Sequence, residues 1–128
     1  MVIDSSVVIA VLLLEPDADQ LLNQLIEAET LYLSAVSLVE TAMVIEYKKG
    51  VAGAKKLDEW LANLSPIIVE FDHQQAKLAR TAWREYGKGR HPAKLNFGDC
   101  CSYALAKQLN KPLLFKGNDF SQTDMGSK

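Results

Sequence analysis

Four acidic residues stand at positions from which their side chains could act on one ligand. Asp4 follows a short apolar segment at the start of the chain, and Asp119 lies in the turn after the apolar segment Leu113–Phe115. Glu40 and Asp99 each lie in the first turn of a segment with helical spacing. In open α/β sheets, sites form at the carboxyl ends of the strands. The four acids are therefore expected to converge at one rim of such a sheet.

The chemistry that these carboxylates could perform depends on a cation. An all-oxygen ligand set suits Mg²⁺ or Mn²⁺, whereas carboxylates gathered without a cation would repel and raise each other's pKa. A bound divalent ion can lower the pKa of a water molecule and offset the charge on a phosphate. The pattern therefore predicts phosphodiester hydrolysis that depends on a bound divalent ion.

Each acid also has a purely structural interpretation. Asp4 could cap the helix that follows it, and Glu40 forms with Ser37 the S-x-x-E pattern of a capping box. The helix dipole favours Asp99 near a helix N-terminus, and Asp119 lies in a Gly-Asn-Asp turn, where such residues are common. Any one of these acids alone would be read as structural, and only the combination of four indicates a site.

Strands and helices are expected to alternate along the chain. Short apolar runs predict buried strands over residues 1–3, 31–33, 67–69 and 113–115. Helical spacing of apolar residues predicts helices over 5–14, 17–28, 37–50, 54–64, 73–86 and 97–109. Short apolar strands between helices indicate a mostly parallel sheet covered on both faces, so the fold class is α/β.

Length and composition predict one domain without a membrane segment. The chain has 128 residues, which suits a single core. Its longest apolar run, Val7–Leu14, is too short to span a bilayer, and no basic segment precedes it, which argues against a signal peptide. Cys100 and Cys101 are adjacent and suit neither a disulfide framework nor a zinc site, which favours a reducing, cytoplasmic setting.

Charge is distributed unevenly along the chain. Residues 1–47 contain acids but no Lys or Arg. A basic segment follows later and includes Lys77, Arg80, Arg84, Lys88, Arg90 and Lys94. An anionic polymer could bind there through charge neutralisation, although a solvated helix face would have the same composition. His91 is expected to be a solvated loop residue rather than a general acid, and Trp60 and Trp83 are expected in the core rather than stacked on bases.

Four sequence motifs resemble those of PIN-domain nucleases, in order and over nearly the whole chain. The first is Met1-Val-Ile-Asp4-Ser-Ser, and the second is Ser37-Leu-Val-Glu40-Thr-Ala. The third is Asn96-Phe-Gly-Asp99-Cys-Cys, and the fourth runs from Leu113 through Asp119 to Asp124. The combination is similar to the VapC toxins of type II toxin–antitoxin pairs. Asn118 is a departure, because some relatives carry a further acid there.

The resemblance implies a PIN-like three-layer α/β/α fold over residues 1–124, with 125–128 as a tail. It implies a Mg²⁺- or Mn²⁺-dependent endoribonuclease that inhibits translation, with Asp4, Glu40, Asp99 and Asp119 as metal ligands. Ser6 would orient Asp4 or a metal-bound water, and Asp124 would give outer support. It also implies a homodimer and a VapB-type antitoxin through which operator DNA is bound. The surface with Val36, Leu38, Val39 and Met43 could serve the dimer or the antitoxin.

Three alternatives remain open from the sequence. A receiver-like signalling domain would use Asp72 as phosphoacceptor and Lys116 after the last strand, although Glu40 and Asp99 would then have no role. A PIN-like binding module without activity is the second, and the retained acids argue against it. The third is a PIN nuclease that acts on DNA or in RNA processing without an antitoxin, and the absence of extra domains argues against it.

Overall fold

The computed structural model describes residues 1–117 and 120–125. Its strands are β1 (Val2–Ile3), β2 (Tyr32–Ser34), β3 (Ile67–Val69) and β4 (Leu113–Leu114). Its helices are α1 (Ser5–Leu12), α2 (Ala18–Glu27), α3 (Ala35–Leu64), α4 (His73–Tyr86) and α5 (Phe97–Leu109). The predicted alternation of strands and helices is confirmed, with boundaries displaced by a few residues.

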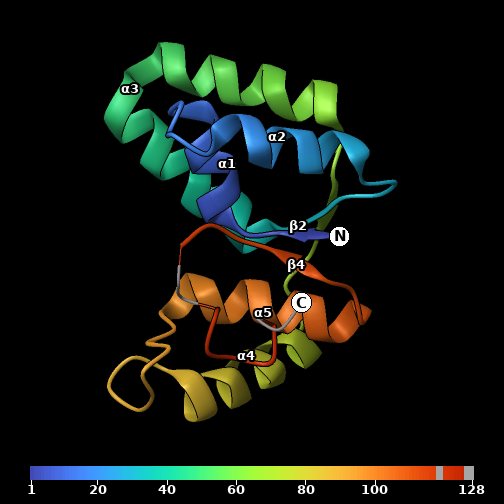
Figure 1. Ribbon diagram of the computed structural model, residues 1–128, viewed down its shortest axis with the longest axis vertical. Coiled ribbons are helices and arrows are strands. Elements are labelled where there is room, and N and C mark those ends of the chain that lie inside the picture. Colours follow the sequence, from blue (N-terminus) through green and yellow to red (C-terminus); the bar gives the residue numbers. More distant parts are fainter. Residues whose placement is uncertain (118–119, 126–128) are drawn as a thin grey trace.

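The four described strands form one parallel sheet in the order β3-β2-β1-β4. Figure 1 shows three layers, with α1, α2 and α3 covering one face of the sheet and α4 and α5 covering the other. The chain therefore has the predicted α/β/α architecture. Because the strands are parallel, their carboxyl ends lie along one rim, at the left of the view.

Two apolar clusters fill the space on either side of the sheet. The first includes Ile3, Val7, Leu25, Leu33 and Ile45, and Trp60 packs against it as predicted. The second joins α4, α5 and β4 through residues such as Leu95, Tyr103, Leu105 and Phe120. Each layer of helices thus buries its own apolar face against the strands. Along 1–117 and 120–125, no helix combines the length and apolarity needed to cross a membrane.

Helix α3 bends sharply at Gly50, whose φ of 67° and ψ of −158° are not helical. The predicted break at this residue is confirmed, and Figure 1 shows the second half of α3 turning back across α2. The predicted start of the helix is wrong by two residues. Ser34 is the N-cap and its hydroxyl accepts from the Val36 amide at 3.2 Å. Ser37 is therefore inside the helix, where its hydroxyl lies 3.2 Å from that of Ser102.

Candidate active site

Asp4 lies where β1 ends and α1 begins, with only 2% of its surface exposed. It caps the helix, because Oδ2 accepts from the Ser6 amide at 3.0 Å. The Ser6 hydroxyl in turn accepts from the Lys116 amide at 3.0 Å, which ties the end of β4 to the end of β1. The two strand ends that carry the first and fourth motifs are thereby held together.

Glu40 reaches the same rim from the second turn of α3, one turn further in than predicted, because the helix begins at Ala35. The Ser5 hydroxyl donates to Glu40 Oε1 at 2.9 Å, although the two residues are 35 positions apart in the chain. Ser37 does not form a capping box with Glu40, because the helix begins earlier, at its Ser34 cap. Sequence reasoning singled out Ser6 and missed Ser5; the only available signal was the Ser-Ser pair directly after Asp4.

Asp99 lies in the first turn of α5 and is 7% exposed. It forms a capping box with Asn96, since the Asp99 amide donates to Asn96 Oδ1 at 2.8 Å and the Asn96 amide donates to Asp99 Oδ2 at 3.0 Å. The preceding residue, Gly98, is in close contact with Glu40. A Cβ atom at Gly98 would lie 2.5 Å from both Glu40 carboxylate oxygens. The first turn of α5 therefore leaves space for the Glu40 carboxylate beside Asp99.

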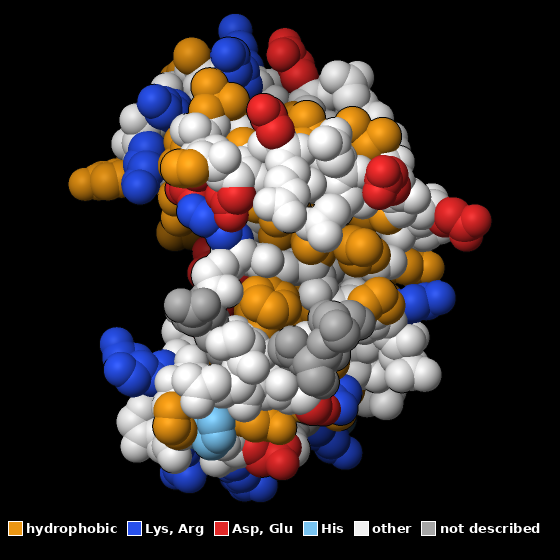
Figure 2. All heavy atoms as spheres, in the orientation of Figure 1, with side chains coloured by type: hydrophobic (Ala, Val, Ile, Leu, Met, Phe, Trp, Pro, Cys, Tyr) orange, Lys and Arg blue, Asp and Glu red, His pale blue; other side chains and the backbone are white. Residues whose placement is uncertain are grey.

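These contacts gather three of the four predicted acids at one rim, from β1, α3 and α5. Asp119, the fourth, lies outside the described residues. Figure 2 shows a recess between the two helical layers at the left edge, with acidic side chains inside it and basic side chains projecting from the rim below. Acidic side chains thus lie in the space between the layers with cations close by, while Asp4 and Asp99 are themselves almost fully buried.

The donor chemistry of this rim suits a hard divalent cation, because Asp4, Glu40 and Asp99 offer only oxygen atoms. Within residues 1–117 and 120–125, no three Asp, Glu, His or Cys side chains are arranged as a ready ligand set. Glu40 is held by Ser5, and Asp4 and Asp99 each accept a backbone hydrogen bond. The oxygen donors of these three acids therefore suit a hard divalent ion. The three acids would supply only part of its ligand set.

Cys100 and Cys101 follow Asp99 and are both buried free thiols. Burial raises the pKa of Cys100 to about 11, with a further contribution from the nearby charge of Asp99. Burial likewise raises the pKa of Cys101 to about 12, with smaller contributions from Cys100 and Glu40. Both thiols are neutral near pH 7, so they add no charge to the rim and no soft ligand to it.

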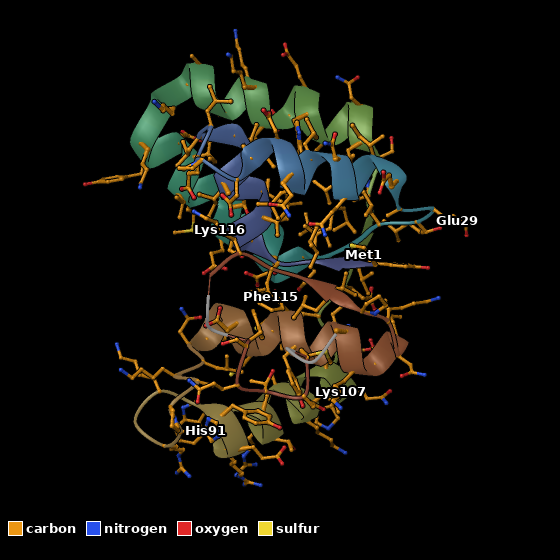
Figure 3. The ribbon with its side chains drawn as sticks, in the orientation of Figure 1. Met1, Glu29, His91, Lys107, Phe115 and Lys116 are labelled. Carbon is orange, nitrogen blue, oxygen red and sulfur yellow. The ribbon has the colours of Figure 1, made fainter. Side chains whose placement is uncertain are left out.

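The side chain of Lys116 is paired with acids outside the predicted set. Figure 3 places it on the side of the sheet covered by α1 and α2, where it forms ion pairs with Glu15 and, at 3.6 Å, with Asp17. The hydrogen bond to Glu15 is the main cause of its raised pKa. Asp72, the other residue of the receiver alternative, caps α4 by accepting from the Gln75 amide at 2.8 Å. The two follow opposite edge strands, β3 and β4, so the fold does not support that alternative.

Asp124 is bound by α5. It accepts from the Tyr103 hydroxyl at 2.7 Å and forms an ion pair with Lys107. Burial by itself would raise the pKa of Asp124, but the hydrogen bonds from Lys107 and Tyr103 outweigh it and hold the pKa below its usual range. These contacts fasten the last described residues to α5. The role of Asp124 in supporting the metal ligands stays a prediction.

The predicted basic residues Arg80, Arg84, Lys88, Arg90 and Lys94 are all exposed, on α4 and the loop after it. The prediction for Trp83 is wrong: its side chain is 43% exposed, and the Arg90 guanidinium lies 4.1 Å from the centroid of its ring. His91 stabilises the loop, because its Nδ1 accepts from the Ala93 amide at 3.0 Å and its ring packs edge-on against Tyr86.

Residues 1–125 match the PIN domain family. The chain is 49% identical to "Ribonuclease VapC" of Mycolicibacterium smegmatis over 127 residues, covering 99% of this chain and 98% of that protein. It is 48% identical to "Ribonuclease VapC30" of Mycobacterium tuberculosis over 128 residues, covering 99% and 97%. "Ribonuclease VapC28" of the same organism is 41% identical over 124 residues, covering 96% and 93%.

Two solved structures have the same fold at low sequence identity. A toxin–antitoxin complex from Klebsiella pneumoniae aligns with a TM-score of 0.74 at 16% identity, covering 97% of this chain and 92% of that one. Mycobacterium tuberculosis VapC20, described as a sarcin–ricin loop cleaving toxin, aligns with a TM-score of 0.69 at 19% identity, covering 94% and 92%. With its acidic rim and its close relatives, the chain belongs to the VapC ribonucleases of the PIN-domain family.

Proposed function

We propose that the protein is a Mg²⁺- or Mn²⁺-dependent endoribonuclease, the toxin of a toxin–antitoxin pair, which inhibits translation by hydrolysing RNA phosphodiester bonds. The observation that carries this proposal is the position of Glu40, hydrogen-bonded to Ser5 beside Asp4 and packed against Gly98 beside Asp99. Three elements thereby bring carboxylates to one rim, and two of these carboxylates, Asp4 and Asp99, are buried. Such an arrangement is costly unless a cation offsets the repulsion.

Asp4, Glu40 and Asp99 would hold the ion, with Asp119 as the proposed fourth ligand. When bound, such an ion lowers the pKa of a coordinated water and offsets charge on the phosphate. The chain itself supplies orientation: the Ser6 amide fixes Asp4, the Ser5 hydroxyl fixes Glu40, and the Asn96 amide fixes Asp99. Ligands held in this way need little reorganisation during the reaction.

The proposed protein partners are a second copy of the chain and a VapB-type antitoxin, through which operator DNA would be bound in the cytoplasm. Support for an apolar partner comes from α3, where Val39 and Met43 are exposed and border a groove together with Phe97. Leu38 does not belong to this surface, because it packs against the core between the sheet and α1–α3. An amphipathic segment could lay its apolar face in this groove.

Cleavage of total RNA by the purified protein in Mg²⁺, Mn²⁺ or EDTA tests the proposed activity. We expect discrete fragments that require a metal ion and that disappear in Glu40→Gln and Asp99→Asn. Glu46→Gln is the matched control, because Glu46 is an exposed acid further along the same helix. Full cleavage in EDTA, cleavage by both site variants, or a covalent RNA–protein adduct would contradict the proposal.

A further inference from the structure

A second groove lies beside the acids, between α4, the loop after it and the first turn of α5. Its volume is about 630 Å³, and the residues that define it include Phe71, Ala79, Arg80, Trp83, Lys88 and Phe97. We call it the α4 groove. Its walls are largely apolar and aromatic, and among the described residues that line it two are cationic and none is acidic.

Trp83 is the fixed aromatic wall of the α4 groove. A Cβ atom at Gly87 would lie 2.4 Å from Trp83 Cδ1 and 2.9 Å from Nε1, so the edge of the indole is seated against the backbone of the loop. The Arg90 guanidinium, 4.1 Å from the ring centroid, further restrains the ring. The indole is thus held at one edge by the loop backbone and over its ring by Arg90, yet it is still 43% exposed. Such a ring is preorganised for contact with a planar ligand.

The charges of the α4 groove suit a phosphate backbone. Arg80 and Lys88 line it and are both exposed. Cations beside an aromatic ring form the combination that binds single-stranded nucleic acid, through phosphate neutralisation and base stacking.

The α4 groove reaches the acidic rim directly. Asn96 and Phe97 line it, and they immediately precede Gly98 and Asp99 in the chain. Phe97 is 74% exposed and also borders the neighbouring groove that contains Glu40. A nucleotide bound in the α4 groove would therefore lie next to the phosphate that the acids act on.

We propose that the α4 groove is a nucleotide subsite of the substrate, in which an unstacked RNA base lies on the indole of Trp83 while Arg80 and Lys88 bind the flanking phosphates. This inference rests on the proposed ribonuclease function. It predicts a preference for single strands and exposed loops over duplex, because only an unpaired base can turn into the groove. Stacking is tolerant of base identity, so the subsite selects an accessible base more than a particular one.

The test is binding of a fluorescent single-stranded RNA of mixed sequence and about ten nucleotides, followed by anisotropy in Mg²⁺. An Asp99→Asn background keeps the RNA intact. In this background we compare Trp83→Ala, Trp83→Phe and the control Tyr47→Ala, since Tyr47 is an exposed aromatic residue on α3. A chain of abasic sugar phosphates of the same length is the second ligand, because it has the charge of RNA without its bases.

Loss of stacking in Trp83→Ala should weaken RNA binding about five- to hundredfold. Trp83→Phe should retain most of the affinity, Tyr47→Ala should leave it unchanged, and all four proteins should bind the abasic chain alike. Unchanged RNA binding in Trp83→Ala would overturn the inference, as would an equal loss on RNA and on the abasic chain. Release of the antitoxin by Trp83→Ala with RNA binding unchanged would assign the groove to the protein partner and overturn it too.

Cleavage measured in the Asp99-containing protein separates this inference from the proposed function. Cleavage that Trp83→Ala leaves unchanged in both kcat and KM would uphold the ribonuclease and overturn the subsite. Base-dependent RNA binding that needs Trp83, in a protein that cleaves nothing, would uphold the subsite and refute the ribonuclease.

Discussion

Single residues at the acidic rim combine structural and chemical roles. Asp4 caps α1 and Asp99 closes the capping box of α5, so the structural interpretations of both acids are confirmed. Both carboxylates are nonetheless almost fully buried at the rim where Glu40 arrives. Backbone hydrogen bonds offset part of the cost of burying a charge and also fix its direction. Capping therefore prepares these carboxylates to hold an ion.

Gly98→Ala should abolish most of the activity while leaving the fold intact. The added Cβ would lie 2.5 Å from both Glu40 carboxylate oxygens and displace them. The clash is with the end of a flexible side chain, and Ala is favoured over Gly in a helix by about 0.5–1 kcal/mol, so stability should not fall. Activity loss of about tenfold or more is expected from RNA cleavage rates, beside an unchanged melting temperature. Wild-type rates in this variant would contradict the role of Glu40.

Secondary-structure elements position the rim through their ends. The acids lie at the carboxyl end of β1, in the second turn of α3 and in the first turn of α5. The Ser6–Lys116 hydrogen bond joins the ends of β1 and β4. Helix α5 is central, because it carries Asp99, packs against α4 and anchors Asp124. A substitution in one element can therefore displace an acid, which lowers activity, or weaken packing, which lowers stability. The two effects should be measured separately.

Gly50→Ala should destabilise the protein without changing the rim. Gly50 has φ 67° and ψ −158°, a conformation that costs other residues about 1–3 kcal/mol. A Cβ there would meet nothing within 4 Å, so the cost is one of backbone conformation alone. Urea unfolding should show a loss of that size, and activity below the transition should be retained. The exposed neighbour Lys48→Ala is the control, and equal stability of the two variants would refute this account of the bend.

The thiols of α5 should resist alkylation in the native protein. Burial raises the pKa of Cys100 to about 11 and that of Cys101 to about 12, so the reactive thiolate is scarce at about pH 8. Iodoacetamide labelling followed by mass spectrometry should be slow in native protein and rapid in urea, where access and ordinary pKa values return. Raising the pH from about 8 toward about 10 should increase the native rate steeply, because below its pKa a thiol forms about ten times more thiolate for each pH unit. Rapid native labelling at about pH 8 would show that α5 is not packed as described.

At the scale of the whole molecule, the uneven charge of the sequence becomes a spatial arrangement. The basic residues of α4 and its loop lie in the helical layer opposite α1–α3, across the recess that contains the acids. Bound RNA would then contact cations beside the site and carboxylates within it. The cations provide affinity by neutralising phosphates, whereas the acids hold the ion that the reaction needs.

Reversing Arg84 and Lys94 to Glu should weaken RNA binding and reduce its dependence on salt. Removal of one cation that neutralises a phosphate should lower the salt slope of the binding constant by about one. Arg84 and Lys94 are exposed and neither lines the α4 groove, so the effect reports charge rather than stacking. Lys55 and Lys56 on α3, reversed to Glu together, form the control. Equal salt slopes for the two double variants would refute a role for the α4 layer in RNA binding.

Local patterns in the sequence determined the elements and the candidate acids. Apolar runs and helical spacing predicted the strands and helices, and Gly50 was recognised as a break. The match to the PIN domain family confirms the resemblance carried by the four motifs. The resemblance predicted Asp4, Glu40, Asp99 and Asp119 as metal ligands, and this role stays a prediction. These features depend on neighbouring residues or on motif order, which a sequence displays directly.

Only the tertiary structure decided which side chains meet. Ser5 bonds Glu40, Gly98 receives its carboxylate, and Lys116 turns to Glu15, although the partners in each pair are far apart in the chain. Trp83 has the spacing of a core residue. Its ring instead packs by one edge against the loop after α4 and stays partly exposed at the surface. Periodicity reports which face of a helix is apolar. It does not report whether the fold covers that face, which depends on how distant segments pack.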